Sequence, residues 1–168
     1  MLMNTLVPAK PEELGVCIGI LREGRMFQQE QGFTQWTEDY PTPALIEEDI
    51  RTGSGYLMKI DGEPAAYMFL SFDDDPAYQP PECAWRADVP YVAVHRIAFA
   101  RRFAGRGLSP AVFGLIRDLC RERGVGCIRI DTDKKNQRMQ HVLEKNGFVR
   151  CGYVLFEGDK KLAYDNLF

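Results

Sequence analysis

The segment Ala104–Ser109 combines two glycines with nearby arginines, and these are residue types that could bind an anion. Gly105 and Gly107 permit a tight turn and a close approach of the backbone to a ligand. A predicted helix follows directly, and a helix N-terminus offers N–H groups and the positive end of its dipole to a phosphate. Further positive charge comes from Arg101, Arg102 and Arg106. An ordinary connection between a strand and a helix has the same form, so both interpretations stay open.

Two regular elements must position this turn. Before it, Tyr91–Phe99 is mostly apolar on both faces, which is typical of a central strand covered on both sides. After it, apolar residues recur every three or four positions from Leu108 to Cys120, which predicts an amphipathic helix. We expect Ser109 to cap this helix and Gly124 to end it.

Periodicity and turn residues predict the other elements. A helix begins at Pro11 and reaches Met26–Phe27, with a kink or break at Gly24 as an open alternative. Asp61-Gly62 joins a hairpin. Strands are predicted at Leu2–Val7, Gly55–Ile60, Pro64–Phe72, Cys127–Asp131, Val149–Phe156 and Lys161–Tyr164, and helices at Pro43–Arg51 and Asn136–Lys145. This order predicts one α/β (α+β) domain over residues 1–168, with a mixed, mostly antiparallel sheet flanked by helices and parallel pairing near the turn.

Composition limits the class of protein. The chain has 168 residues and is 45% hydrophobic, which is enough for a core without disulfides. A net charge of −3 gives no support for nucleic-acid binding, and neither a membrane helix nor a secretory signal is expected. The five scattered cysteines favour reduced core thiols, and two histidines without a CxxC pattern favour the absence of a metal site. We therefore expect a cytoplasmic protein.

The residues around the turn resemble the GNAT-type acyl-CoA-dependent N-acetyltransferase superfamily. The likeness covers most of the chain from about Leu14 and rests on His95–Phe99, Ala104–Ser109, Asp131-Thr132, Asn136 and Asn146–Phe148. It implies a strand–turn–helix site whose turn wraps the pyrophosphate of acetyl-CoA, the expected cosubstrate. It also implies that the backbone of Ile97, Ala98 and Phe99, together with Asn136, binds the pantetheine arm and the acyl carbonyl.

Two registers of the family's Arg/Gln-x-x-Gly-x-Gly/Ala turn are open. Arg102–Gly107 matches it literally, whereas Ala104–Ser109 fits the distances to the flanking elements and directly precedes the helix. We prefer the second register, in which Ala104 replaces the usual Arg or Gln and backbone N–H groups bind the phosphates. Its residues are Ala104, Gly105, Arg106, Gly107, Leu108 and Ser109.

The chemistry that the resemblance implies is direct attack of a neutral amine on the thioester, within a ternary complex. His95 lies where several relatives carry a base that accepts the amine's proton, and an ordinary imidazole suits that role; a hydrogen-bonded core histidine is the alternative. Arg96 points to the other face and is expected to form an ion pair or anchor a loop. Relatives often have an acidic tyrosine where this chain has Leu143, so either the thiolate leaves unaided or another group such as Tyr153 serves. A non-catalytic acyl-CoA-binding or regulatory domain is the alternative function.

The resemblance implies that the acceptor is a primary amine, either on a small molecule or at a peptide N-terminus. Trp36, Tyr40 and Trp85 either roof the core or form a wall of the acceptor site. The acidic triplet Asp73–Asp75 is either a solvated loop tip or a rim that attracts a cation. Acetyl-CoA and this amine are the expected partners, without nucleic acid or membrane, and a homodimer is left open.

Overall fold

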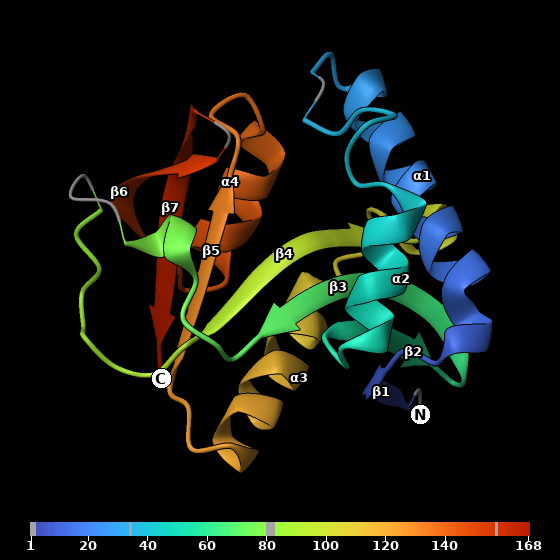
Figure 1. The fold of residues 1–168 in the computed structure, drawn as a ribbon, viewed down its shortest axis with the longest axis horizontal. Helices are drawn as coiled ribbons and strands as arrows, with labels where there is room; N and C mark the ends of the chain where they lie inside the picture. Colours follow the sequence, from blue (N-terminus) through green and yellow to red (C-terminus); the bar gives the residue numbers. More distant parts are fainter. Residues whose placement is uncertain (1–2, 34, 80–82, 157) are drawn as a thin grey trace. The chain divides into compact units, whose positions relative to one another are not determined.

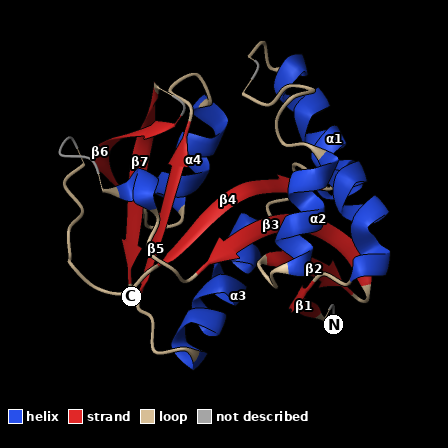
Figure 2. Ribbon diagram, in the orientation of Figure 1, coloured by secondary structure: helices blue, strands red, loops and turns tan. Residues whose placement is uncertain are grey.

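The computed structural model describes residues 3–33, 35–79, 83–156 and 158–168. Leu2, predicted to begin the first strand, and the loop residues Pro80-Pro81 lie outside these ranges. Hydrogen bonds connect the strands in the order β1-β2-β3-β4-β5-β7-β6, and helices flank them (Figures 1 and 2). The β4–β5 pair is parallel, whereas the β1–β2, β2–β3, β5–β7 and β6–β7 pairs are antiparallel. The predicted mixed, mostly antiparallel fold is therefore confirmed.

The chain forms two compact units, of which the first contains the N-terminal part up to Leu70 and Arg96–Leu115. In this unit Asp61 and Gly62 have φ values of 50° and 82°, so the predicted Asp-Gly turn joins its hairpin. Helix α2 packs on the hairpin through Ile50 beside Gly55, and the Tyr67 hydroxyl donates a hydrogen bond to Asp49. The elements are β1 (Asn4–Pro8), η1 (Pro11–Glu13), α1 (Leu14–Glu30), α2 (Pro43–Arg51), β2 (Gly55–Ile60), β3 (Glu63–Ser71) and η3 (Arg101–Phe103).

The second unit contains Ser71–His95 and Ile116–Phe168, so β4 (Val92–Phe99) and α3 (Ser109–Glu122) pass through both units. Val92–Val94 pairs in parallel with Ile128–Ile130, and β7 pairs antiparallel with both β5 and β6. One face of this sheet carries a core of Tyr78, Tyr91, Ala93, Cys127, Val154 and Ala163. The other elements are η2 (Pro76–Tyr78), β5 (Cys127–Thr132), α4 (Gln137–Lys145), β6 (Val149–Phe156) and β7 (Asp159–Leu167). The single-domain assignment stays a prediction.

Helix α1 is continuous from Leu14 to Glu30, so the alternative of a break at Gly24 is wrong, and the helix extends beyond the predicted end. Gly24 is needed for close packing. A Cβ at this position would lie 2.9 Å from Cζ3 of Trp36 and 3.0 Å from Cβ of Ala98. The glycine thus lets the helix approach both β4 and the loop that follows the helix.

Replacing Gly24 with alanine is expected to destabilise the protein by about 1–3 kcal/mol, because the new methyl group overpacks this contact. Gly19→Ala is the matched control. A Cβ at Gly19 meets nothing within 4 Å, so this change is expected to stabilise α1 by about 0.5–1 kcal/mol through its helix propensity. Urea unfolding of the two variants measures both effects, and equal shifts would contradict the packing role of Gly24.

No helix in the described ranges is long and apolar enough to cross a membrane.

Candidate functional site

The glycine turn lies in the first unit and leads directly into α3. Gly105 and Gly107 have φ values of 75° and 69°, a region that strains other residues, so the sequence needs glycine there. The helix begins at Ser109, and the Leu108 carbonyl accepts its first hydrogen bond from Val112 N at 3.1 Å. Ser109 is thus the first residue of the helix, and its role as the cap stays a prediction. The preferred register, in which the turn ends where the helix starts, agrees with this geometry.

Three arginines lie in the turn or just before it, and their surroundings differ. Arg101 donates from its backbone N to Glu23 and forms an ion pair with Glu30 at 2.8 Å. Arg102 forms an ion pair with Glu63. Arg106 is exposed, stacks over Phe103 at 5.8 Å, and has no carboxylate partner among the described residues. Among these three, Arg106 is therefore the guanidinium left available to an anion.

The C-terminal half of β4 lies next to α1. Ala98 is buried against Gly24, while Ile97 and Phe99 are half-buried. Arg96 has a φ of 54°, which interrupts the extended conformation of the strand. Its side chain forms an ion pair with Asp49 at 2.8 Å and donates a hydrogen bond to the Tyr40 hydroxyl at 3.1 Å. The prediction that Arg96 forms an ion pair and anchors a loop is confirmed.

His95, in the second unit, lies between two carboxylates. Its Nε2 is 2.7 Å from Oδ2 of Asp75, and its Nδ1 is 3.5 Å from Oδ1 of Asp131. Tyr78 packs its ring 5.4 Å from the imidazole and donates its hydroxyl to Asp131 at 2.6 Å. Burial, and then the Asp131 charge, raise the pKa of Tyr78 well above its usual value, so this hydroxyl stays a hydrogen-bond donor.

This arrangement can accept a proton. The contact of Nε2 with Asp75 has hydrogen-bond length, so in the neutral ring we assign the proton to Nε2 and the acceptor role to Nδ1. When Nδ1 takes a proton, the positive ring lies between two carboxylates that stabilise it. The side chains of His95, Asp75 and Asp131 are 13–19% exposed, so solvent screens these charges only partly.

Asp75, Asp131 and Tyr78 were not predicted as partners of His95. Asp75 belongs to the acidic triplet, for which a solvated tip was one of the two predictions. Its Oδ1 accepts a hydrogen bond from Ala77 N and so caps η2. The Asp75-Pro76 pair, typical of a helix start, is the sequence signal that could have placed this carboxylate in ordered structure.

Asn136 and Tyr153 also belong to the second unit. Asn136 is 9% exposed and caps α4 through a hydrogen bond that its Oδ1 accepts from Met139 N.

Tyr153 is 36% exposed and lies opposite Leu162 in the β6–β7 pair. Leu162 pairs with Thr132, the neighbour of Asp131, so alternation places Tyr153 on the sheet face opposite to Asp131. The structure therefore does not bring Tyr153 to His95 and its two carboxylate partners. Leu143, at the position of the relatives' tyrosine, is fully buried.

The three predicted acceptor aromatics are divided between the two units. Trp36 is 7% exposed and packs on Gly24. Tyr40 accepts a hydrogen bond from Arg96 in the same unit. Trp85 belongs to the second unit, where its Nε1 donates to the Tyr78 carbonyl at 2.8 Å. Each aromatic has a packing or anchoring role, and the acceptor role stays a prediction for all three.

All five cysteines are free thiols, and their surroundings hold them in the protonated form. Burial raises the pKa of Cys17, Cys120 and Cys151 to about 12 and that of Cys83 to about 11, and it also raises the pKa of Cys127. A thiol in this state is a poor nucleophile. Among the described residues, no group of three or more His, Cys, Asp or Glu side chains could hold a metal ion.

Comparisons with known proteins place these features in context. The family model described as "Acetyltransferase (GNAT) family" matches residues 23–148. The crystal structure of a GNAT-family acetyltransferase from Streptococcus agalactiae is 31% identical, with a TM-score of 0.86, covering 98% of this chain and 95% of that one. A Listeria monocytogenes GNAT-family acetyltransferase is 21% identical, with a TM-score of 0.74 over 98% of this chain and 95% of that one.

A third structure, the aminoglycoside acetyltransferase AAC(6')-Ib with ribostamycin and coenzyme A, is 20% identical. Its TM-score is 0.71, and the match covers 98% of this chain and 93% of that one. At this identity the likeness concerns the fold. A search of curated protein sequences found no match.

Proposed function

Because the chain belongs to the GNAT acetyltransferase family, we propose that it transfers an acetyl group from acetyl-CoA to a primary amine. The observation that carries this proposal is the turn from Ala104 to Ser109. Its two left-handed glycines lead into a helix N-terminus, and a Cβ at Gly107 would meet no atom within 4 Å. The chain therefore leaves the outer side of Gly107 open, as close approach of a phosphate requires.

In this proposal, residues of the two units have separate tasks. The turn and Arg106 bind the pyrophosphate, and Asn136 and the backbone of Ile97–Phe99 bind the pantetheine arm and the acyl carbonyl. When bound, acetyl-CoA supplies the activated thioester. His95 accepts the proton of the attacking amine at Nδ1, directly or through water, and Asp75 orients its ring. Asp131 then stabilises the imidazolium. The resemblance supports the ternary complex, and we propose a cytoplasmic location from composition.

A non-catalytic acyl-CoA-binding domain is the second candidate function. Leu143 favours it, because the relatives' tyrosine is replaced by a buried side chain that cannot donate a proton. The structure also does not bring Tyr153 to His95. The deciding experiment measures free thiol released from acetyl-CoA across a panel of primary amines. Amine-dependent release supports the transferase. Acetyl-CoA binding without release for any amine supports the binding domain.

Arg106→Ala is expected to weaken acetyl-CoA binding about 5- to 30-fold, because it removes one exposed, charge-assisted contact with the pyrophosphate. Arg102→Ala is the matched control. It removes the same charge from a nearby position in the chain, but from a side chain that already pairs with Glu63, so we expect less than about a twofold change. Calorimetric titration with acetyl-CoA measures both, and equal losses would show that only net charge matters.

A further inference from the structure

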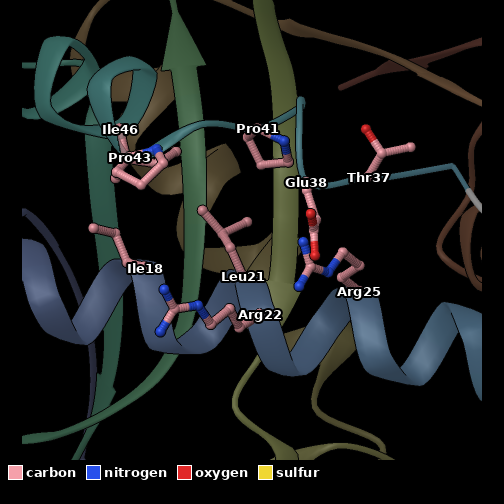
Figure 3. A pocket seen from close by; sticks show the side chains of 9 residues that line it. All are labelled: Ile18, Leu21, Arg22, Arg25, Thr37, Glu38, Pro41, Pro43 and Ile46. Atoms are coloured by element: carbon pink, nitrogen blue, oxygen red, sulfur yellow. The ribbon is translucent and has the colours of Figure 1, made fainter.

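A cavity of about 250 Å³ lies in the first unit, between α1 and the segment that leads into α2. Figure 3 shows side chains of α1 on one side of it and residues of the segment from Thr37 to Ile46 on the other. Leu21 and Ile46 contribute to an apolar wall, and Arg22, Arg25 and Glu38 add charge. The cavity thus combines apolar surface with a few charged groups, which is typical of a site for a small molecule.

The two arginines that line this cavity have no polar partner among the described residues. Arg22 and Arg25 lie one helical turn apart on α1, so both reach the same cavity. Neither forms a hydrogen bond or ion pair with any described residue, and Nε of Arg25 is buried without a hydrogen-bond partner. A buried N–H without an acceptor is unfavourable, and a ligand that supplies an acceptor removes this cost.

The charged side chains that line the cavity favour one class of ligand. Two guanidinium groups and the Glu38 carboxylate give the lining a net charge of +1, which suits a monoanion better than a dianionic phosphate. A carboxylate is the monoanion that matches the planar fork of arginine. The apolar wall and the volume indicate that the rest of the ligand is apolar and has about the size of one amino acid.

The cavity lies close to the C-terminal half of β4. Leu21, which lines the cavity, is three residues from Gly24 on α1, and Gly24 contacts Ala98 of β4. Residues three apart lie on nearly the same side of a helix and about one turn apart, roughly 5 Å. The cavity therefore adjoins the part of β4 that we assign to the acyl group.

We propose that Arg22 and Arg25 bind the carboxylate of the acceptor. The acceptors are then amines that also carry a carboxylate and an apolar body, such as apolar amino acids or short peptides with a free C-terminus. This inference rests on the proposed transferase function. It differs from the alternative in which the acidic triplet Asp73–Asp75 attracts a cation.

The experiment compares each amino acid or peptide with its amide, which lacks the negative charge. The amide also has a less basic amine, so each preference is compared between the wild type and the Arg25 variant. L-leucine, L-phenylalanine and glycyl-L-leucine are tested against their C-terminal amides in the thiol-release assay. In the wild-type protein we expect kcat/KM to be at least tenfold higher for the acids. In Arg25→Gln this preference is expected to disappear, while the KM for acetyl-CoA stays within twofold. Arg51→Gln is the matched control, since Arg51 is exposed on α2 outside the cavity and pairs with Glu48.

Direct binding separates a wrong cavity assignment from a wrong function. N-acetyl-L-leucine and its amide are titrated calorimetrically without acetyl-CoA, so this measurement needs no transfer. Binding of the acid alone, lost in Arg25→Gln, supports the carboxylate site even if no amine is acetylated. Acetyl transfer with equal rates for acids and amides, or an acid preference that survives Arg25→Gln, would overturn the carboxylate site and leave the transferase function standing.

Discussion

Replacing Gly107 with valine is expected to lower acetyl-CoA affinity at least 100-fold. Valine cannot adopt a φ of 69° without strain, and its side chain would occupy the open side of the turn, where we place the pyrophosphate. Loss of two charge-assisted hydrogen bonds at about 1.5–3 kcal/mol each is enough for this effect. Calorimetric titration with acetyl-CoA measures it.

Gly53→Val controls for backbone strain. Gly53 has a φ of 76°, and a Cβ added there would meet no atom within 4 Å. This glycine follows α2 and does not belong to the turn before α3. Both variants are expected to lose about 1–3 kcal/mol of stability to the strained backbone. Only Gly107→Val should lose acetyl-CoA binding. If both variants bind acetyl-CoA normally, the turn does not hold the pyrophosphate.

His95→Gln is expected to lower kcat/KM about 100-fold or more, which is the usual contribution of a general base. Below neutral pH most of an amine acceptor is protonated and needs a base, whereas at high pH the amine is already neutral. Only a neutral imidazole can accept that proton, so the wild-type protein loses its base at the acidic end of the profile. The deficit should therefore be largest near neutral pH and shrink towards both ends of the pH–rate profile. Thiol release measured from about pH 6 to 9 tests this expectation.

His141→Gln is the matched control, because His141 is the other histidine of the chain and is exposed on α4. It should retain wild-type kinetics at every pH. A uniform loss in His95→Gln, with the shape of the profile unchanged, would assign His95 to the positioning of other groups. Circular dichroism melts guard against unfolding, since the glutamine replaces the imidazole ring that contacts Asp75 and Asp131.

Much of the fold and the turn could be predicted from the sequence, because their causes are local. Gly105 and Gly107 were predicted to permit a tight turn, and both are left-handed in the structure. The apolar spacing after Leu108 predicted α3, and Asp61-Gly62 predicted the first hairpin. Signals of this kind depend on a few neighbouring residues, so they need no knowledge of the tertiary structure.

The surroundings of His95 could not be predicted in the same way. Its partners Asp75 and Asp131 are distant in the sequence, and no local pattern indicates that both reach one imidazole. Gly24 is a similar case. Helix propensity alone predicts a weak point there, and only the packing against Trp36 and Ala98 explains why glycine is required. No sequence pattern distinguishes Arg22 and Arg25 either. The role that we propose for them depends on the lack of a polar partner among the described residues, which only the structure reveals.

The protonated cysteines have a practical consequence for measuring acetyl transfer. Reagents that detect free coenzyme A react with thiolates, and at neutral pH the folded protein presents almost none. Background colour from the enzyme itself should therefore be low, even when the protein is used at high concentration against a slow acceptor. Unfolding exposes all five sulfur atoms, so the same reagent also counts the molecules that have lost their structure during an assay.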